Sequence, residues 1–358
     1  MSLLRLITFR QQAAPVIELD WTQIGPTYWP DYQTSINATI ATTTVADTTI
    51  TPTASFPNAC RGGVLLADGR VYLLPRGSST ATIYDPVTDT TSVPSGTFSG
   101  SYDSGVLMFD GRIFCVPQNT TTAQIYDPIA DTLTAATGTY PTNFTTPSGV
   151  MLPNGNVFMP SQNSYLIYNP TLDTTTATSV AIGQNYGAVL LPNGNVFIVP
   201  GFNTTTAQIY DYITDTITPA TGVYPSGNNF RGGVLLADGR VLCIPYLQTS
   251  ARIYDPVTDT TTTPGVAFPQ SYGGKLMPDG RVFLVPYNSA TAKIYDPVAD
   301  TITNATGTYG TGLDFVNSVL LKDGRVFVIP NSSTTARIYG GGGGFDENVA
   351  LSAYINRT

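Results

Sequence analysis

The sequence predicts an all-β fold built from seven similar units, and three observations support this prediction. Helix formers are scarce, since the 358 residues include only two glutamates and three lysines. Threonine, glycine, proline, tyrosine and valine dominate instead, a composition that favours strands and turns. Two short motifs also recur seven times at a nearly constant spacing, which is the signature of a repeat architecture.

The first motif is an Asp-Gly or Asn-Gly pair, and successive copies of its glycine lie 39 to 45 residues apart. These glycines are Gly69, Gly111, Gly155, Gly194, Gly239, Gly280 and Gly324. The second motif is Ile-Tyr, and its tyrosines are Tyr84, Tyr126, Tyr168, Tyr210, Tyr254, Tyr295 and Tyr339. Residues 61–71 recur unchanged as residues 231–241, so some copies of the unit are nearly identical.

Each unit is predicted to form four short strands. In the first copy, residues 63–67 and 70–74 flank Asp68-Gly69, a pair that predicts a two-residue type I′ hairpin turn. Pro75 ends the second strand, because proline cannot donate a ladder hydrogen bond. Residues 81–84 are a third strand, and the threonine-rich residues 90–93 are a fourth, more polar one. Four short strands in a repeat of this length are typical of a β-propeller blade.

The seventh copy lacks a fourth strand, because Gly340 directly follows the Ile-Tyr motif and begins a run of five glycines. The missing strand is found near the N-terminus, where residues 45–56 match residues 298–309 of the sixth copy. We therefore expect residues 45–52 to pair with the strand that ends at Tyr339. This pairing closes a seven-bladed β-propeller and removes the exposed edges of an open stack of blades.

The same comparison divides the chain into three segments. Residues 1–44 are an irregular arm, residues 45–339 are the propeller, and residues 340–358 are a glycine-rich tether with a short tail. The arm is predicted to contact other protein subunits, because exposed aromatic patches mark contact surfaces. Its aromatic residues are Trp21, Tyr28, Trp29 and Tyr32. The alternative is that the arm folds back onto its own propeller.

The repeat pattern Val-Leu-Leu-x-Asp-Gly-Arg-Val, followed by Ile-Tyr-Asp-Pro-x-x-Asp-Thr, resembles kelch repeats of the galactose-oxidase type over residues 45–339. The sequence departs from that family in three ways. A proline stands where kelch blades carry a double glycine, the fourth strand lacks its tryptophan, and no histidine is present for a copper site. The resemblance therefore implies the architecture and not the oxidase chemistry.

Candidate catalytic groups are few. The absence of histidine removes the commonest general base and the commonest metal ligand. Nearly every aspartate belongs to a repeat motif, either Asp-Gly-Arg or Asp-Pro-x-x-Asp. The second motif, as in Asp85 and Asp89, is interpreted as a turn whose second aspartate bonds backbone amides, with calcium binding as the alternative. We therefore expect no enzyme activity, no metal and no cofactor.

Charge and cysteine content narrow the partners. The net charge of −8 argues against nucleic acid, which requires clustered lysine and arginine. Cys115 and Cys243 lie in hydrophobic runs and are expected to be buried core residues. The first ten residues do not form a signal-peptide core, and no apolar run is long enough to span a membrane. The predicted location is a virion, or otherwise the cytoplasm.

An aromatic residue precedes the first strand in six of the seven copies, where a propeller chain enters the mouth of its central channel. These candidate ligand-binding residues are Tyr102, Phe144, Tyr186, Phe230, Tyr272 and Phe315. They are expected either to stack on a sugar or peptide, or to pack between blades and seal the channel. Arg61 and Arg231 lie beside this ring and are the candidate polar contacts.

Three functions remain open on the sequence. The first is a structural or attachment module of a larger assembly, a composition-based hypothesis that points to a phage virion component such as a tail, adsorption or capsid-decorating protein. The second is a carbohydrate-binding propeller that recognises a cell-surface glycan through the aromatic ring. The third is a kelch-type scaffold that binds a protein partner.

Overall fold

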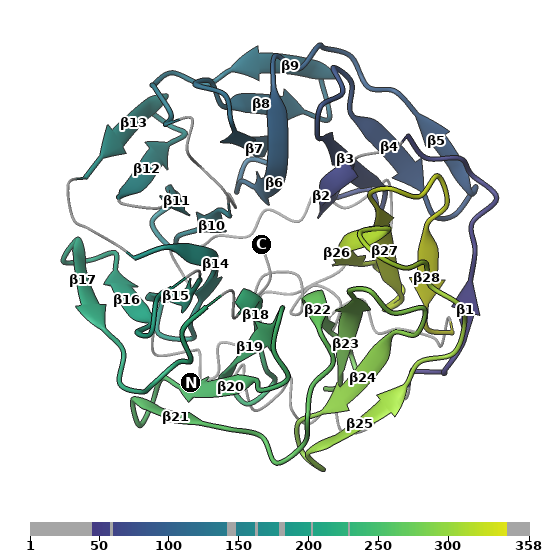
Figure 1. The fold of residues 1–358 in the computed structure, drawn as a ribbon. Helices are drawn as coiled ribbons and strands as arrows, with labels where there is room; N and C mark the ends of the chain where they lie inside the picture. Colours follow the sequence, from purple (N-terminus) through teal and green to yellow (C-terminus); the bar gives the residue numbers. More distant parts are fainter. Residues whose placement is uncertain are drawn as a thin grey trace, which may run out of the picture.

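The computed structural model describes residues 45–57, 60–141, 148–161, 164–178, 183–201, 203–227 and 230–341, and all structural statements below concern these residues. They form seven four-stranded antiparallel sheets arranged in a ring about a central axis (Figure 1). The prediction of an all-β, seven-bladed propeller is therefore confirmed. No described segment is a helix long and apolar enough to cross a membrane.

The first strand of every blade lies nearest the axis and the fourth lies on the outer rim (Figure 1). The first strands are β2 (Cys60–Leu65), β6 (Ser101–Leu107), β10 (Val150–Met151), β14 (Asn185–Leu190), β18 (Phe230–Leu235), β22 (Ser271–Leu276) and β26 (Phe315–Leu320). The second strands are β3 (Val71–Pro75), β7 (Ile113–Gln118), β11 (Val157–Pro160), β15 (Val196–Pro200), β19 (Val241–Pro245), β23 (Val282–Pro286) and β27 (Val326–Pro330).

The third strands are β4 (Thr82–Asp85), β8 (Gln124–Asp127), β12 (Tyr165–Asn169), β16 (Gln208–Asp211), β20 (Arg252–Asp255), β24 (Lys293–Asp296) and β28 (Arg337–Tyr339). The fourth strands are β5 (Thr90–Ser92), β9 (Thr132–Ala135), β13 (Thr174–Ala177), β17 (Thr216–Pro219), β21 (Thr260–Thr262), β25 (Thr301–Asn304) and, from the N-terminal side, β1 (Thr49–Ile50). Blades are numbered in chain order, so that blade 1 is β2–β5 and blade 7 is β26–β28 with β1.

The Ile-Tyr motif recurs because its tyrosine packs against the neighbouring blade. Tyr126 of blade 2 stacks on Tyr72 of blade 1, with ring centroids 4.4 Å apart and an interplanar angle of 15°. Tyr210 of blade 4 stacks in the same way on Phe158 of blade 3, also at 4.4 Å. Second strands are buried along their whole length, whereas fourth strands are largely exposed. Aromatic stacking between the middle strands of adjacent blades is thus one part of the core of the ring, beside the aliphatic side chains buried there.

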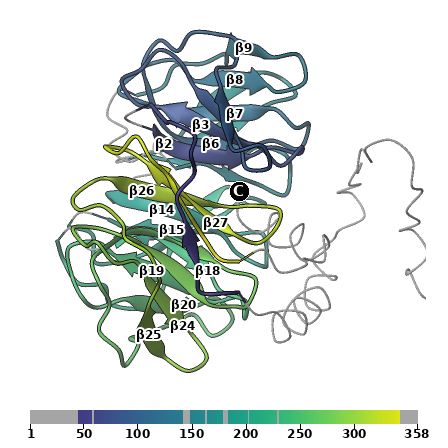
Figure 2. The same cartoon turned by 90° about the vertical axis from the view of Figure 1, so that its right-hand side faces the viewer.

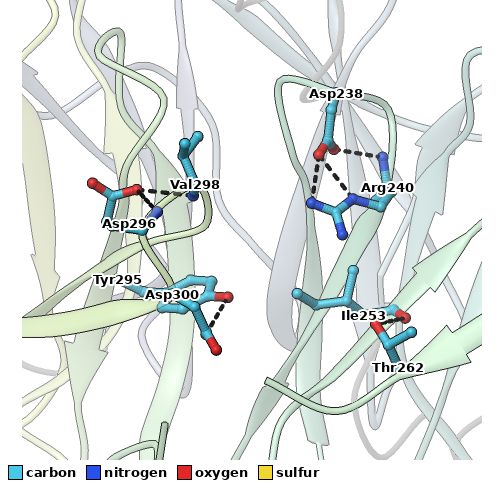
Figure 3. A network of polar contacts seen from close by, with 9 residues as sticks. Asp238, Arg240, Ile253, Thr262, Tyr295, Asp296, Val298 and Asp300 are labelled. Carbon is cyan, nitrogen blue, oxygen red and sulfur yellow. Dashed lines mark hydrogen bonds and ion pairs between the residues drawn. The ribbon is translucent and has the colours of Figure 1, made fainter. Parts of the chain in front are cut away.

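The Asp-Gly pair forms a hairpin turn of a different type from the predicted one. A type I′ turn requires positive φ at both central residues, yet only the glycine has it, with φ of 96° at Gly69. Leu66 N–H donates to the Arg70 carbonyl at 2.8 Å, so three residues lie in the loop instead of two. Asp68 accepts a hydrogen bond from Arg70 N–H at 3.0 Å, and this bond fixes the loop. Figure 3 shows the equivalent Asp238–Arg240 turn.

The Asp-Pro-x-x-Asp motif forms a turn that also links neighbouring blades. Its first aspartate accepts backbone N–H groups within the turn, as Asp296 does from Val298 at 2.9 Å (Figure 3). Its second aspartate has positive φ and accepts the hydroxyl of the Ile-Tyr tyrosine, as Asp300 does from Tyr295 at 3.1 Å. The same carboxylate accepts an N–H from the preceding blade, for example that of Gly265 at 2.7 Å. The turn interpretation of the sequence is therefore confirmed.

The N-terminal strand closes the ring as the sequence predicts. Thr49 and Ile50 of β1 pair antiparallel with β28, opposite Tyr339 and Ile338. Asp47, just before β1, accepts the N–H of Thr306 at 2.9 Å and so provides for blade 7 the contact that the second aspartate provides elsewhere. In Figure 2, where this side of the ring faces the viewer, β1 runs along its outside.

Candidate functional site: an arginine–tyrosine cluster at one mouth of the channel

Two positions per blade face one mouth of the channel, and the first is set by a β-bulge. In six blades one residue of the first strand pairs with the proline of the second strand. The register shifts between this residue and the next paired residue of the first strand. Bulges redirect side chains and are common beside functional sites. The residues that directly follow this pairing are Arg61, Asp103, Tyr186, Arg231, Tyr272 and Val316.

The second position directly follows the proline of the second strand. Its seven residues are Arg76, Gln118, Ser161, Gly201, Tyr246, Tyr287 and Asn331. Both positions vary from blade to blade, although the units that contain them are nearly identical elsewhere. The packing and turn motifs repeat from blade to blade, whereas these two positions differ between most blades, so repeated packing alone does not explain their residues.

Arg231 lies at the centre of an aromatic cage. Its guanidinium carbon is 4.5 Å from the ring centroids of Tyr246 and Tyr272, and 5.0 Å from that of Tyr186. Cation–π contacts of this length hold the guanidinium in place. Burial raises the pKa of Tyr246 to about 12 and also raises the pKa of Tyr186, so both hydroxyls remain protonated donors at neutral pH.

Arg61 brings the opposite side of the ring into the same cluster. Its Nη1 donates a hydrogen bond to the Tyr272 hydroxyl at 3.3 Å, although Arg61 belongs to blade 1 and Tyr272 to blade 6. Its guanidinium carbon lies 5.8 Å from the Tyr272 ring centroid. Blade 7 lies between these two blades in the ring, so the hydrogen bond joins two blades that are not adjacent. Side chains of blades 1, 4, 5 and 6 therefore meet in this cluster.

Asp103 of blade 2 supplies the negative charge of the cluster. Its Oδ2 lies 3.8 Å from Arg61 Nη1, and its Oδ1 lies 3.8 Å from Arg76 Nε. The side chains of Arg61 and Asp103 are only 10% and 9% exposed. Burial raises the pKa of Asp103, although Arg61, Arg76 and Arg231 oppose this shift. Three guanidinium groups thus face one carboxylate, which leaves a surplus of at least two positive charges in a chain of net charge −8.

Three buried polar atoms of the cluster have no hydrogen-bond partner among the described residues. They are the Nε atoms of Arg61 and Arg231 and the Oδ1 atom of Asp103. A buried donor or acceptor without a partner costs about 1–3 kcal/mol, and more when it is charged. The two unpartnered donors belong to the surplus cations, so the arrangement suits an added acceptor that carries negative charge.

The channel continues inward from this cluster. A cavity of about 130 Å³ lies between the first strands of blades 3 to 6, beginning two residues further along each strand. Its lining includes Gly149, Leu190, Gly233, Gly274 and Lys275. The cluster therefore lies at the entrance to a narrow channel, and a ligand would rest on it at the surface of the ring.

The six candidate aromatic residues separate into two groups in the structure. Tyr186 and Tyr272 follow the bulge and join Arg61 and Arg231 in the cluster. Three other candidates pair with the proline of the second strand and are buried in the core. They are Tyr102, Phe230 and Phe315.

These three core residues make packing contacts. The Tyr102 hydroxyl donates to the Thr122 carbonyl at 2.9 Å, and Phe230 packs edge-on against Tyr224. The sixth candidate, Phe144, lies outside the described residues, as do Trp21, Tyr28, Trp29 and Tyr32 of the arm.

Four residues of the cluster were not identified from the sequence. They are Arg76, Asp103, Tyr246 and Tyr287. An alignment of the units on the proline of the second strand would have found them. Arg76, Tyr246 and Tyr287 directly follow that proline, and Asp103 follows the residue that pairs with it. Cys60, Cys115 and Cys243 are buried free thiols of the core, and no described acidic or cysteine residues gather into a group able to hold a metal ion.

Comparison with known proteins gives the fold and little more. No protein-family model matches the chain, and no curated protein matches it. Among solved structures, a streptogramin B lyase is similar with a TM-score of 0.71 at 10% identity, over 82% of this chain and 98% of that one. Virginiamycin B lyase from Staphylococcus aureus has a TM-score of 0.64 at 9% identity, over 82% and 98%.

The WD40 propeller domain of Doa1 is similar with a TM-score of 0.61 at 15% identity, over 82% of this chain and 96% of that one. At these identities the likeness shows the fold alone. It supports a seven-bladed propeller, but it supports neither the kelch type nor the phage origin that the sequence suggested.

These structures correct one prediction. We expected no enzyme activity because histidine is absent and the aspartates belong to repeat motifs. That prediction is contradicted by the similar lyase structures, since the same fold over the same share of the chain is that of an enzyme. The flaw in the reasoning is physical: a buried carboxylate with a raised pKa, such as Asp103, is a potential acid or base without any histidine.

Proposed function

We propose that this chain is a ligand-binding propeller that recognises an anionic ligand at the arginine–tyrosine cluster. One observation carries the proposal: the guanidinium groups of Arg61 and Arg231 both contact Tyr272 at the mouth of the channel, and the Nε donor of each has no hydrogen-bond partner among the described residues. Asp103 neutralises one of the three guanidinium groups in the cluster. A carboxylate or similar oxyanion would pair with the remaining charge.

The assembly role predicted for the arm rests on residues 1–44, which lie outside the described residues. A phage virion role is a finer hypothesis that none of the similar structures named above supports. We therefore base the proposed function on the channel mouth. The structure describes its contacts, and its residues differ between blades.

A ligand bound at the channel mouth could also be a substrate. One similar structure is a catalytically inactive virginiamycin B lyase, with a histidine replaced by alanine, bound to quinupristin. The present chain contains no histidine. A reaction at its channel mouth could use the Asp103 carboxyl or a tyrosine hydroxyl for proton transfer.

The test compares two double variants of the full chain. Arg61→Met with Arg231→Met removes the surplus charge, while Arg70→Met with Arg240→Met removes two exposed arginines of the Asp-Gly-Arg turns as a matched control. The Tm of each protein is measured in acetate, phosphate and chloride at equal ionic strength. We expect acetate or phosphate to raise the Tm of the wild type and of the control more than that of the Arg61/Arg231 variant, since phosphate also stabilises proteins without binding to a site. An equal response in the Arg61/Arg231 variant would refute the proposal.

A further inference from the structure

The cluster offers aromatic rings as well as charge, and this combination narrows the ligand class. Tyr246 and Tyr287 follow the strand-ending prolines of neighbouring blades, and their ring centroids are 4.8 Å apart. Tyr272 lies 5.3 Å from Tyr246 and 5.9 Å from Tyr287. Tyr186, Tyr246 and Tyr287 are partly exposed, so part of each side chain is open to solvent.

The distance between the charge and the rings is short. The Arg231 guanidinium carbon is 4.5 Å from the centroids of Tyr246 and Tyr272. A carboxylate held by Arg231 or Arg61 would therefore bring the group that bears it directly against a tyrosine. Tyrosine rings provide an apolar face for the C–H groups of a sugar, and their hydroxyls can bond its hydroxyls.

We propose, on the basis of the function proposed above, that the ligand is an acidic saccharide whose carboxylate sits on one pyranose ring. In such a sugar the carboxylate is attached directly to the ring, as the geometry of the cluster requires. The arginines take the carboxylate, and the tyrosines take the ring face and the hydroxyl groups.

The charge distribution favours an acidic saccharide over an extended polyanion and over a dianionic phosphate. A nucleic acid or another extended polyanion requires a basic stripe, but the net charge is −8 and five further arginines pair with aspartates in the Asp-Gly-Arg turns. A dianionic phosphate suits the cluster less well, because the Asp103 carboxylate lies within 3.8 Å of two of its arginines and repels added negative charge. A single carboxylate brings less negative charge close to Asp103 and is therefore repelled less than a dianionic phosphate.

The experiment measures the binding of three probes to the full-length protein by ligand-observed NMR and calorimetry. Methyl glucuronide carries both the ring and the carboxylate, methyl glucoside carries the ring alone, and acetate carries the carboxylate alone. We expect methyl glucuronide to bind at least about tenfold more tightly than either of the others, because it makes both sets of contacts. Arg231→Met should weaken its binding by about tenfold or more.

A second variant tests the aromatic part separately. Tyr287→Leu removes one ring of the cluster and leaves in place every charge and the three tyrosines that contact Arg231, so it should lower the affinity for methyl glucuronide while acetate binding is unchanged. Circular dichroism and thermal melting establish that both variants fold.

The possible outcomes distinguish the two proposals. If acetate binds as tightly as methyl glucuronide, the site recognises anions but the saccharide inference is wrong. If neither acid binds, both the inference and the proposed function fail. If methyl glucoside binds as well as methyl glucuronide, the arginines do not select the ligand, and the inference again fails.

Discussion

The contact between Asp173 of blade 3 and Thr137 of blade 2 provides a quantitative test of how the blades are held together. The Thr137 N–H donates to Asp173 Oδ1 at 3.0 Å, and the Thr137 hydroxyl donates to Oδ2 at 2.6 Å. The Tyr168 hydroxyl donates to Oδ1 at 2.9 Å. Asp173 also has a φ of 48°, a backbone conformation that most side chains avoid. Asp173→Ala therefore removes three hydrogen bonds and strains the backbone.

The expected cost follows from these two effects. A hydrogen bond contributes roughly 0.5–1.5 kcal/mol, and partial exposure places these bonds near the low end, so the three together contribute about 2 kcal/mol. A positive φ costs alanine about 1 kcal/mol more. Asp173→Ala should thus lower the free energy of unfolding by about 3 kcal/mol. Asp173→Gly should lose only about 2 kcal/mol, because glycine accepts positive φ.

The assay is equilibrium unfolding in guanidinium chloride, followed by circular dichroism. Asp110→Ala is a control within one blade, because Asp110 pairs with Arg112 of its own exposed turn. We expect a loss below about 1 kcal/mol. If Asp173→Ala unfolds at the same denaturant concentration as the control, the contact between blades does not stabilise the ring. If the glycine and alanine variants are equally stable, the backbone argument is wrong.

Three further predictions concern the whole ring. The pKa values of Asp131, Asp173 and Asp259 are lowered because a side-chain hydroxyl and an N–H of the preceding blade donate to each carboxylate. The stabilisation by these carboxylates is therefore complete above the unfolded pKa of about 4 and is lost as pH falls through the folded pKa values. Acid titration of the Tm should show this loss below about pH 4, and a flat profile there would contradict it. Deletion of residues 45–56 removes β1 and should lower the Tm of the whole protein, whereas an unchanged melting curve would refute the closure. Burial raises the pKa of Cys60 to about 12 and raises those of the other two thiols, so thiol reagents should label the cysteines only after unfolding, and rapid labelling of the native protein would show that the core opens.

Much of the fold could be predicted because each blade repeats the same local signals. Asp-Gly between apolar runs marks a hairpin, although the turn contains three residues instead of two and only Gly69 has positive φ. The proline that follows each apolar run ends the second strand in every blade except blade 2, where β7 continues to Gln118. The match of residues 45–56 to residues 298–309 identifies the closing strand. These signals depend on the chemistry of neighbouring residues, which a sequence displays directly.

The site was predicted only in part, because its residues depend on the register of the bulge. Tyr102 and Tyr272 look equivalent in the sequence, since each is an aromatic residue just before an apolar run. Tyr102 pairs with Pro117 and points into the core, whereas Tyr272 follows the paired residue Ser271 and joins the cluster. A shift of one residue reverses the direction of a side chain in a strand, so composition near a strand end does not decide which face the side chain takes.

The sequence by itself determined the strand class, the number of blades and the way the ring closes, since these follow from local patterns repeated along one chain. Only the tertiary structure brought Arg61 and Tyr272, 211 residues apart, to a hydrogen-bond distance of 3.3 Å. The physical reason is that closing seven blades into a ring places the bulges of non-adjacent blades around one axis. Charge and burial at that axis are properties of the closed ring, and no single repeat contains them.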